Sequence, residues 1–347
     1  MTSGATFTDS AVVAAIRAGN ESTFTDAVER HRRELQVHCY RMLGSLDDAE
    51  DAVQETLLRA WRSRTSFEGR STFRAWLYRI ATNASLDFLA RRPRPALARA
   101  GGRPTPSADH AGRVPPAAEL AWLQPYPDRL LDPSAPDEQE PEALTIDKET
   151  IELAFLVALQ HVPPRQRAVL LLRDVMGWTA PETARLLEMT VPSVKSALQR
   201  ARSTLRMHLP GHRLMWAGPT DPTEQERDLL RRFIEANERG DMDALTAMLH
   251  EDAWQTMPPG AQWFVGRQAM LDMWAAAIVG PDAQGEWRLL PTRANRQPAA
   301  ANYLRRPGDR VFRASNLDVL RIEGNQIAEI MTFGSDVFPA FGLPMTL

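Results

Sequence analysis

The prolines of this chain are distributed unevenly, and their distribution limits the folds that the chain can adopt. Eleven of the 26 prolines fall between Pro93 and Pro141, in a tract otherwise rich in alanine, arginine, glycine and acidic residues. Proline fixes φ and lacks a backbone N–H, so neither a helix nor a strand persists through this density. We therefore expect residues 93–147 to form a linker. A chain of 347 residues is longer than a single hydrophobic core usually accommodates, so we expect separate domains on either side of the linker.

One part of the linker differs from the rest. Residues 121–131 place two aromatic residues and three leucines in an otherwise polar tract. Apolar side chains of this kind are stabilised when they leave water, so we expect this segment to dock on another part of the protein.

Composition excludes several classes of protein. No apolar run approaches the ~20 residues that a membrane-spanning helix needs, and the polar segment Met1–Ser10 is not expected to be a secretory signal. The single cysteine, Cys39, excludes a disulfide framework and a cysteine-based zinc cluster. We expect a cytoplasmic protein that has no metal and no cofactor.

Charge is also unevenly distributed. Residues 148–213 contain ten basic and five acidic residues, whereas residues 214–347 contain 13 basic and 18 acidic residues. Within residues 189–213 there are five basic residues and no acidic residue, a local charge that suits contact with phosphates.

Before the linker, the sequence has the period of helices. Val53, Leu57, Ala60 and Trp61 recur at helical spacing, and the other side of this helix carries Asp51, Gln54, Glu55 and Arg59. This polar face is either solvated or a surface for a partner.

A second helix follows Ser71, with a core stripe of Phe73, Leu77, Ile80 and Ala84. Cations beside aromatic rings suit single-stranded nucleic acid, because cations follow the backbone and rings stack on bases. The candidates for such contacts are Arg74, Trp76, Tyr78, Arg79, Asn83 and Arg91. The alternative for Trp76 is a place in the core.

After the linker, the spacing of helices and turns is that of a helix-turn-helix. Thr179–Glu182 caps a short helix, residues 188–190 form a turn, and a last helix runs from Val191 to Arg206. The apolar stripe of the last helix leaves polar side chains that can reach base edges and phosphates. These candidates are Ser193, Lys195, Ser196, Gln199, Arg200 and Arg202.

Three ordered motifs, in residues 47–61, 73–83 and 159–202, resemble the extracytoplasmic-function (ECF) group of bacterial sigma factors. The resemblance implies a promoter-specificity subunit whose partners are core RNA polymerase and promoter DNA. It implies polymerase contact by Asp51, Gln54 and Glu55. Near the opened −10 strand it places Trp76, Arg79 and Asn83, with Asn83 holding a flipped base. At the −35 element it places Ser193, Lys195, Ser196, Gln199 and Arg200. This sequence departs from the family at Glu188, where glycine is usual.

The C-terminal part has a different pattern. Two amphipathic helices within residues 231–249 precede short alternating runs such as Leu317–Ile322, which predict strands. Together with residues 252–267, this pattern resembles the SnoaL-like cone fold of the nuclear transport factor 2 superfamily. We therefore expect a multidomain protein with two all-α sigma domains and a C-terminal α+β domain. The expected segments are residues 1–92 (sigma region 2), 93–147 (linker), 148–213 (sigma region 4) and 214–347 (SnoaL-like domain).

Some cone-fold proteins are enzymes, so a catalytic site must be considered. His250, Glu251 and Asp252 are adjacent, but neighbouring residues point in different directions, and we expect no catalysis. Three further residues line either a pocket or the core: Trp254, Met257 and Trp263. The resemblance implies a regulatory domain, and the opposite charges of residues 148–213 and 214–347 permit an intramolecular contact.

Two other functions stay open at this point. One is a ligand-responsive regulator that binds duplex DNA without polymerase, and the other is an enzyme joined to a DNA-binding module. The polar face of residues 47–61 distinguishes a sigma factor from both of these alternatives, since only a sigma factor has a use for it.

Overall fold

The computed structural model describes residues 9–69, 71–91, 117, 120–131, 151–209, 222–260, 262–281 and 283–347. The chain forms two compact units, which are described separately. Unit 1 consists of residues 1–94 and 158–209, and unit 2 of residues 95–157 and 210–347. The expected segment boundaries near residues 92, 147 and 213, and most of the expected linker, lie outside the described residues. Among the described helices, none is long and apolar enough to cross a membrane.

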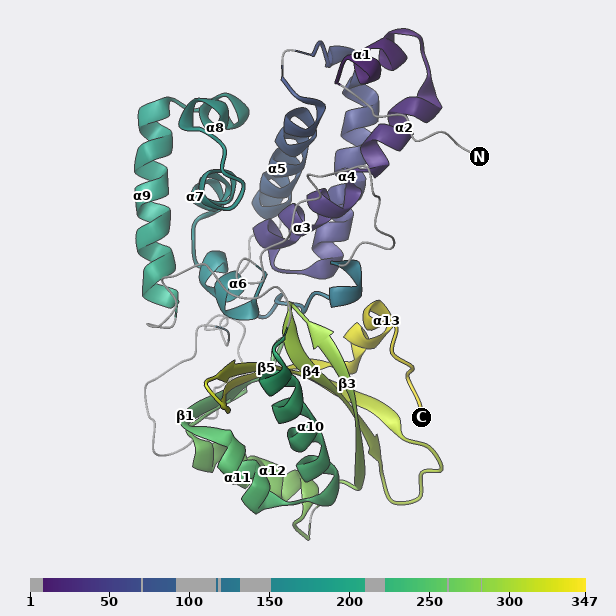
Figure 1. Cartoon of the computed structure of the whole chain (residues 1–347), viewed down its shortest axis with the longest axis vertical. Coiled ribbons are helices and arrows are strands. Elements are labelled where there is room, and N and C mark those ends of the chain that lie inside the picture. Colours follow the sequence, from purple (N-terminus) through teal and green to yellow (C-terminus); the bar gives the residue numbers. More distant parts are fainter. Residues whose placement is uncertain are drawn as a thin grey trace. The chain divides into compact units, whose positions relative to one another are not determined.

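Unit 1 is helical (Figure 1). Its first part contains α1 (Asp9–Arg17), α2 (Glu21–Glu29), α3 (Arg32–Leu43), α4 (Leu46–Ser63), the short helix η1 (Arg64–Ser66) and α5 (Phe73–Arg91). Its second part contains α7 (Pro164–Leu170), the π-helical turn η6 (Leu171–Val175), α8 (Ala180–Leu187) and α9 (Val191–His208). The division between the two units falls within α6 (Leu153–Gln160).

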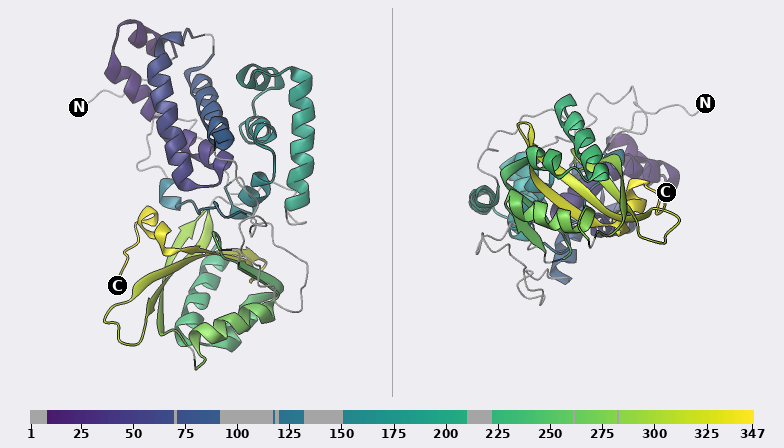
Figure 2. Two further views of the ribbon diagram at one scale, coloured as in Figure 1. Left: turned by 180° about the vertical axis from the view of Figure 1, so that it is seen from behind. Right: turned by 90° about the horizontal axis from the view of Figure 1, so that it is seen from below.

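Local sequence signals explain where these helices begin and end. Ser45 caps α4 by accepting a hydrogen bond from the Asp48 N–H at 3.2 Å. Thr179 and Glu182 form a reciprocal capping box at the start of α8, as the sequence predicts. Glu188 ends α8 at φ +53°, so this glutamate adopts the left-handed conformation that glycine takes more easily. Figures 1 and 2 both show α9 beside α7 and α8.

Unit 2 contains a mixed six-stranded sheet in the order β2-β1-β6-β5-β4-β3. The strands are β1 (Leu249–Thr256), β2 (Trp263–Val265), β3 (Glu286–Ala294), β4 (Gln297–Arg305), β5 (Arg313–Glu323) and β6 (Gln326–Gly334). The pairing of β1 with β6 is parallel, and the other pairs are antiparallel. The short helices are η4 (Asp128–Leu130), η7 (Ser335–Val337) and α13 (Phe338–Phe341).

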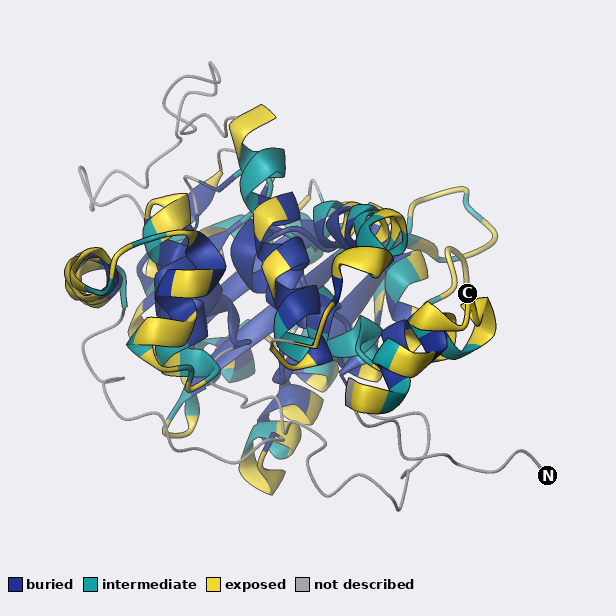
Figure 3. Ribbon diagram, turned by 90° about the horizontal axis from the view of Figure 1, so that it is seen from above, coloured by how far each residue is buried: buried dark blue, intermediate teal, exposed yellow. Residues whose placement is uncertain are grey.

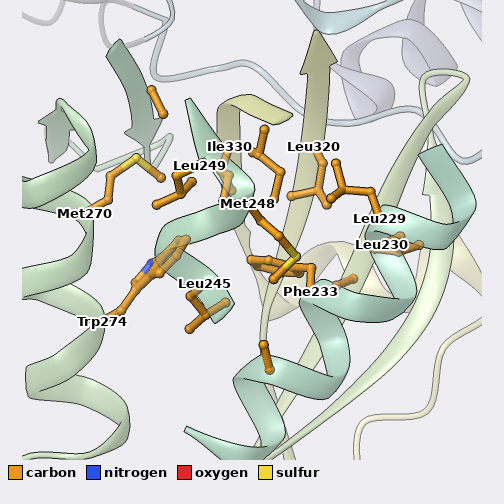
Figure 4. Packing of buried hydrophobic residues seen from close by; sticks show 14 of the residues in the cluster. Leu229, Leu230, Phe233, Leu245, Met248, Leu249, Met270, Trp274, Leu320 and Ile330 are labelled. Carbon is orange, nitrogen blue, oxygen red and sulfur yellow. The ribbon is translucent and has the colours of Figure 1, made fainter. Parts of the chain in front are cut away.

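Three longer helices cover one face of the sheet, which we call the helix-covered face. They are α10 (Glu224–Arg239), α11 (Met242–Met248) and α12 (Arg267–Ile278). Figure 4 shows Phe233 of α10 and Trp274 of α12 pointing into the same core as Leu320 and Ile330 of the sheet. Each fully buried side chain of this size contributes about 1.5–3 kcal/mol, so this core holds the helices on the sheet.

The turn between β3 and β4 binds the apolar segment of the expected linker. The Asn295 side chain accepts a hydrogen bond from the Tyr126 N–H at 2.7 Å and donates one to the Ile151 carbonyl at 2.7 Å. The Asn295 N–H donates to the Tyr126 carbonyl at 2.8 Å, and the Arg296 N–H donates to Asp128 Oδ1 at 2.8 Å. The docking expected for residues 121–131 is therefore present, and its partner is the C-terminal sheet.

Candidate nucleic-acid interface

Helix α9 presents a continuous polar surface. Thr190 caps its N-terminus by accepting from the Ser193 N–H at 3.2 Å, and Pro192 lies in its first turn. The apolar stripe of α9 is buried against the rest of unit 1. Figure 3 shows that buried and exposed positions alternate along the helices in general. All six predicted side chains are exposed: Ser193, Lys195, Ser196, Gln199, Arg200 and Arg202.

Arg202 differs from the other five because it has a protein partner. Its guanidinium makes two hydrogen bonds to the Asp174 carboxylate, at 2.8 and 2.7 Å. The ion pair with Asp174 raises the pKa of Arg202, although burial opposes this shift. Such a bidentate pair fixes the orientation of α9 against η6, which leaves Arg202 less available for DNA than Arg200.

The predicted polymerase-binding residues lie on one side of α4. Asp51 and Gln54 are exposed, and Glu55 is partly buried. Arg59 donates to Glu55 Oε1 at 2.7 Å and to Asp87 Oδ2 of α5 at 2.7 Å. Glu55 therefore has a structural partner, whereas Asp51 and Gln54 present their side chains to solvent.

The predicted −10 residues divide into two groups. Arg79, Asn83 and Arg91 are exposed on α5. Trp76 and Tyr78 are only 4% and 3% exposed, so neither ring is open for stacking on a base. Trp76 packs against Phe67 and Phe73, at ring-centroid distances of 5.4 and 5.6 Å, so it occupies the core position that the sequence analysis left open as an alternative.

Arg74 is only partly exposed, and it pairs with Glu34 of α3. Arg74 Nε and the Tyr78 hydroxyl both donate to Glu34 Oε2, at 2.8 and 3.1 Å. Burial acts to raise the pKa of Glu34, but the hydrogen bond from His31 and the charge of Arg74 hold it below its ordinary value. Burial and the neighbouring Glu34 charge raise the pKa of Tyr78. These contacts fasten α5 to α3.

Comparison with known proteins identifies these two helical parts. Residues 27–94 match the family "Sigma-70 region 2", and residues 152–205 match "Sigma-70, region 4". Residues 230–330 match "SnoaL-like domain". The ECF RNA polymerase sigma factor SigG of Mycobacterium tuberculosis is 43% identical over 325 residues, which are 93% of this chain and 85% of SigG. The chain belongs to the ECF family of RNA polymerase sigma factors.

Further relatives share part of the sequence or the fold. SigW of Bacillus subtilis is 28% identical over 197 residues, which are 56% of this ECF sigma factor and 92% of SigW. The crystal structure of Mycobacterium tuberculosis SigJ has the same fold, with a TM-score of 0.58, 19% identity, and coverage of 94% of this chain and all of SigJ. The expected fold class is confirmed. A one-component regulator is not favoured, and sigma factors in general are not enzymes.

The candidate acid–base residues lie at the surface of the SnoaL-like domain of this ECF sigma factor. His250, Glu251 and Asp252 are all exposed, and His250 Nδ1 accepts a hydrogen bond from the Asp252 backbone N–H at 3.2 Å. Trp254 and Trp263 pack with Val265 on the sheet face opposite the helix-covered face, and Met257 follows β1.

A buried polar network on the helix-covered face was missed by the sequence analysis. The Trp274 indole N–H donates to Gln255 at 2.9 Å, Gln255 donates to Thr332 at 2.8 Å, and Thr332 donates to Asp318 at 2.6 Å. Asn302 also donates to Asp318, at 2.6 Å, and its own Oδ1 is buried without a partner in the structure. The available signal was a polar residue at an inward position in each of four strands: Gln255, Asn302, Asp318 and Thr332.

In the Asp318→Asn variant, the stability of the SnoaL-like domain is expected to depend less on pH than it does in the wild type. Burial raises the pKa of Asp318, against the lowering effect of hydrogen bonds from Thr332, Asn302 and Asn316. A raised folded-state pKa gives stability that is present below the unfolded-state pKa and is lost as pH rises through the folded-state pKa. Between the unfolded-state pKa and the folded-state pKa, the wild-type free energy of unfolding falls by about 1.4 kcal/mol per pH unit. Denaturant unfolding between pH 4 and 8 measures this slope.

Asp252→Asn is the matched control, because Asp252 is exposed on the same domain. It should retain the wild-type pH profile, whereas the profile of Asp318→Asn should be flatter. Parallel profiles for all three proteins would contradict a raised pKa at Asp318.

Proposed function

We propose that three exposed faces of this sigma factor perform its recognition steps. Asp51, Gln54 and Glu55 of α4 contact core RNA polymerase, with Glu55 also holding Arg59. Arg79, Asn83 and Arg91 of α5 contact the opened −10 strand. Five residues of α9 contact the −35 element: Ser193, Lys195, Ser196, Gln199 and Arg200. The observation that carries the proposal is the exposure of these faces on helices that match regions 2 and 4.

Four of the expected site residues have a supporting role in this proposal. Arg74, Trp76 and Tyr78 fasten α5 in place, and Arg202 fastens α9 through Asp174. A buried or paired side chain contacts other residues of the protein, so it stabilises the orientation of the exposed residues and does not itself contact bases.

The proposal assigns region 2 to residues 1–92, the linker to residues 93–147, region 4 to residues 148–213 and a modulatory domain to residues 214–347. Support for modulation comes from contacts in unit 2. Gln297 of β4 accepts a hydrogen bond from the Leu153 N–H at 2.9 Å, at the start of α6. Because Leu153 lies within the region 4 match, the C-terminal domain contacts the segment that leads into the DNA-binding helices. The protein acts by binding, in the cytoplasm, without a cofactor.

The affinity of the full chain for core RNA polymerase tests the first step. We expect Asp51→Arg to weaken binding by about 10- to 100-fold, since reversing a charge at the centre of an interface leaves an unpaired charge in contact with the partner. Asp26→Arg makes the same charge change at an exposed position of α2 and should bind as the wild type does. Equal affinities for both variants would contradict the role given to α4.

A further inference from the structure

Five arginines gather at one end of the sheet of the SnoaL-like domain, where β3 begins and a loop joins β4 to β5. Arg305 of β4 lies opposite Glu286 of β3 in the register of the sheet. Arg313, the first residue of β5, pairs with the preceding position of β4, Leu304. The loop between these strands projects from the sheet and carries two more arginines (Figure 1). We call the five residues the arginine patch: Arg288, Arg305, Arg306, Arg310 and Arg313.

The arginines of this domain differ in whether their side chains have protein partners. Those of α10 at positions 231, 232 and 239 form ion pairs with carboxylates of the same helix. Arg321 of β5 pairs with Glu329 of β6 at 2.8 Å. Among the described residues of the domain, four arginine side chains make neither a hydrogen bond nor an ion pair, and all four are exposed members of the arginine patch: Arg288, Arg306, Arg310 and Arg313. Unpaired cations therefore collect at one place.

The arginine patch is also a local exception to the charge of its domain. Residues 214–347 contain 13 basic and 18 acidic residues. Residues 286–288 and 305–313 together contain the five arginines and only two acidic residues, Glu286 and Asp309. The rest of the domain then has eight basic and 16 acidic residues. A positive surface on an acidic domain is not a consequence of its composition.

Contacts with Phe312 hold part of the patch in position. The guanidinium of Arg288 lies 5.1 Å from the centre of the Phe312 ring and that of Arg305 lies 4.8 Å from it, so one ring orients two cations. The backbone of Phe312 is fixed in turn, because its N–H donates to the Leu347 carbonyl at 3.2 Å and its carbonyl accepts from the Leu347 N–H at 2.9 Å. Arginines that are already oriented lose less rotamer entropy when they bind an anion.

The tip of the loop is open. The Asp309 N–H donates to the Arg306 carbonyl at 2.9 Å and closes a turn around Gly308. Gly308 has φ +92°, and no atom lies within 4 Å of a Cβ atom built on it. The space beside the tip can therefore be taken by a partner, as is common for loops on a rigid sheet.

A phosphate backbone is the partner that this arrangement fits best. Guanidinium groups stay charged at physiological pH and bind phosphate oxygens through parallel N–H donors. A protein partner would need a matching acidic surface, whereas every stretch of duplex DNA carries about one negative charge per ~1.7 Å of its axis. Contacts with phosphates carry no sequence information, so such a surface binds DNA of any sequence.

We propose that the arginine patch is a second DNA-binding surface of this sigma factor, which contacts the phosphate backbone of duplex DNA without sequence preference. This goes beyond the proposed function, in which α5 and α9 make the DNA contacts. The patch adds affinity that falls as salt rises, because phosphate contacts release counterions. Binding by the patch does not require recognition of the −35 element by α9, so the two assignments can fail separately.

The salt dependence of DNA affinity tests the patch in the full chain. The probe is a fluorescent random-sequence duplex of about 30 base pairs, titrated at salt concentrations from about 50 to 200 mM. The patch variant combines Arg306→Ala, Arg310→Ala and Arg313→Ala. Each lost phosphate contact removes about 0.9 from the slope of log affinity against log salt concentration. We expect a slope that is shallower by about 2–3 and an affinity at the lowest salt that falls about 10- to 100-fold.

The matched control combines Arg231→Ala, Arg232→Ala and Arg239→Ala. It removes the same charge from the same domain, at exposed positions where the arginines already pair with acidic residues of α10. Its slope and affinity should stay close to those of the wild type. Circular dichroism and thermal unfolding establish that both variants fold. If the patch variant does not fold, Arg310→Ala alone replaces it, with an expected change in slope of about one.

Two results would overturn the proposal. One is a wild-type chain that does not bind the duplex, or whose slope the patch variant shares, which would leave an acidic protein surface as the partner for the patch. The other is an equal loss of affinity in the patch variant and the control, which would show a general effect of net charge. Promoter transcription that does not depend on Arg200 would count against the function proposed for α9 and would leave this comparison unaffected.

Discussion

Replacing Arg200 with alanine is expected to lower transcription from the chain's own upstream region by about 10- to 100-fold. The physical reason is the loss of a bidentate contact with a base, which discriminates by about 1–3 kcal/mol. Arg200 suits this contact because it is exposed on α9, one turn from Ser196, and the apolar stripe of α9 fixes the helix against unit 1. Run-off transcription with core polymerase at limiting sigma concentration measures the effect.

Arg206→Ala is the matched control for this prediction. Arg206 is exposed on the same helix but lies in its last turn, whereas the N-terminal part of a recognition helix contacts base edges. We expect Arg206→Ala to change transcription by less than about threefold and equally on every template. If Arg200→Ala lowers transcription by the same factor on a template with an altered −35 element, Arg200 does not recognise that element.

Replacing Asn295 with alanine is expected to detach residues 120–131 from the C-terminal sheet. The Tyr126 N–H and the Ile151 carbonyl would each lose a buried partner, at a cost of about 1–3 kcal/mol per group. Hydrogen exchange at Tyr126 should therefore accelerate by about 10- to 1,000-fold if exchange follows local opening.

Asn295→Gly separates two effects of this substitution. Asn295 has φ +56°, a conformation that strains alanine but not glycine. Since glycine also lacks the amide, Asn295→Gly should accelerate exchange at Tyr126 by nearly as much as Asn295→Ala. Wild-type exchange in Asn295→Gly would show that backbone conformation, and not the side-chain hydrogen bonds, holds the segment.

The sequence predicted the parts of this protein that depend on local signals. The capping box at Thr179 and the cap and apolar stripe of α9 lie within a few residues of each other, so their helical spacing was sufficient to place the −35 candidates on an exposed face. The separate α+β domain was likewise evident from alternating residues such as those of Leu317–Ile322.

Features that depend on packing between distant segments could not be predicted in this way. Helix α5 is buried on more than one side, so periodicity did not distinguish the buried rings of Trp76 and Tyr78 from exposed residues such as Arg79. The network around Asp318 joins residues from several strands and a helix, and it forms only once the strand register is fixed. The Gln160 side chain donates to the Arg41 carbonyl at the C-terminal end of α3, and no local pattern marks these two residues, which are more than 100 positions apart, as partners.

Run-off transcription with purified core polymerase, with and without the full chain, tests the central claim most directly. The template is the chain's own upstream region, compared with versions altered at the −10 or −35 element. We predict a transcript with one defined start that requires the chain and is lost on both altered templates. Tight, sequence-specific binding of the chain alone to duplex DNA, with no transcript on any template, would contradict the account.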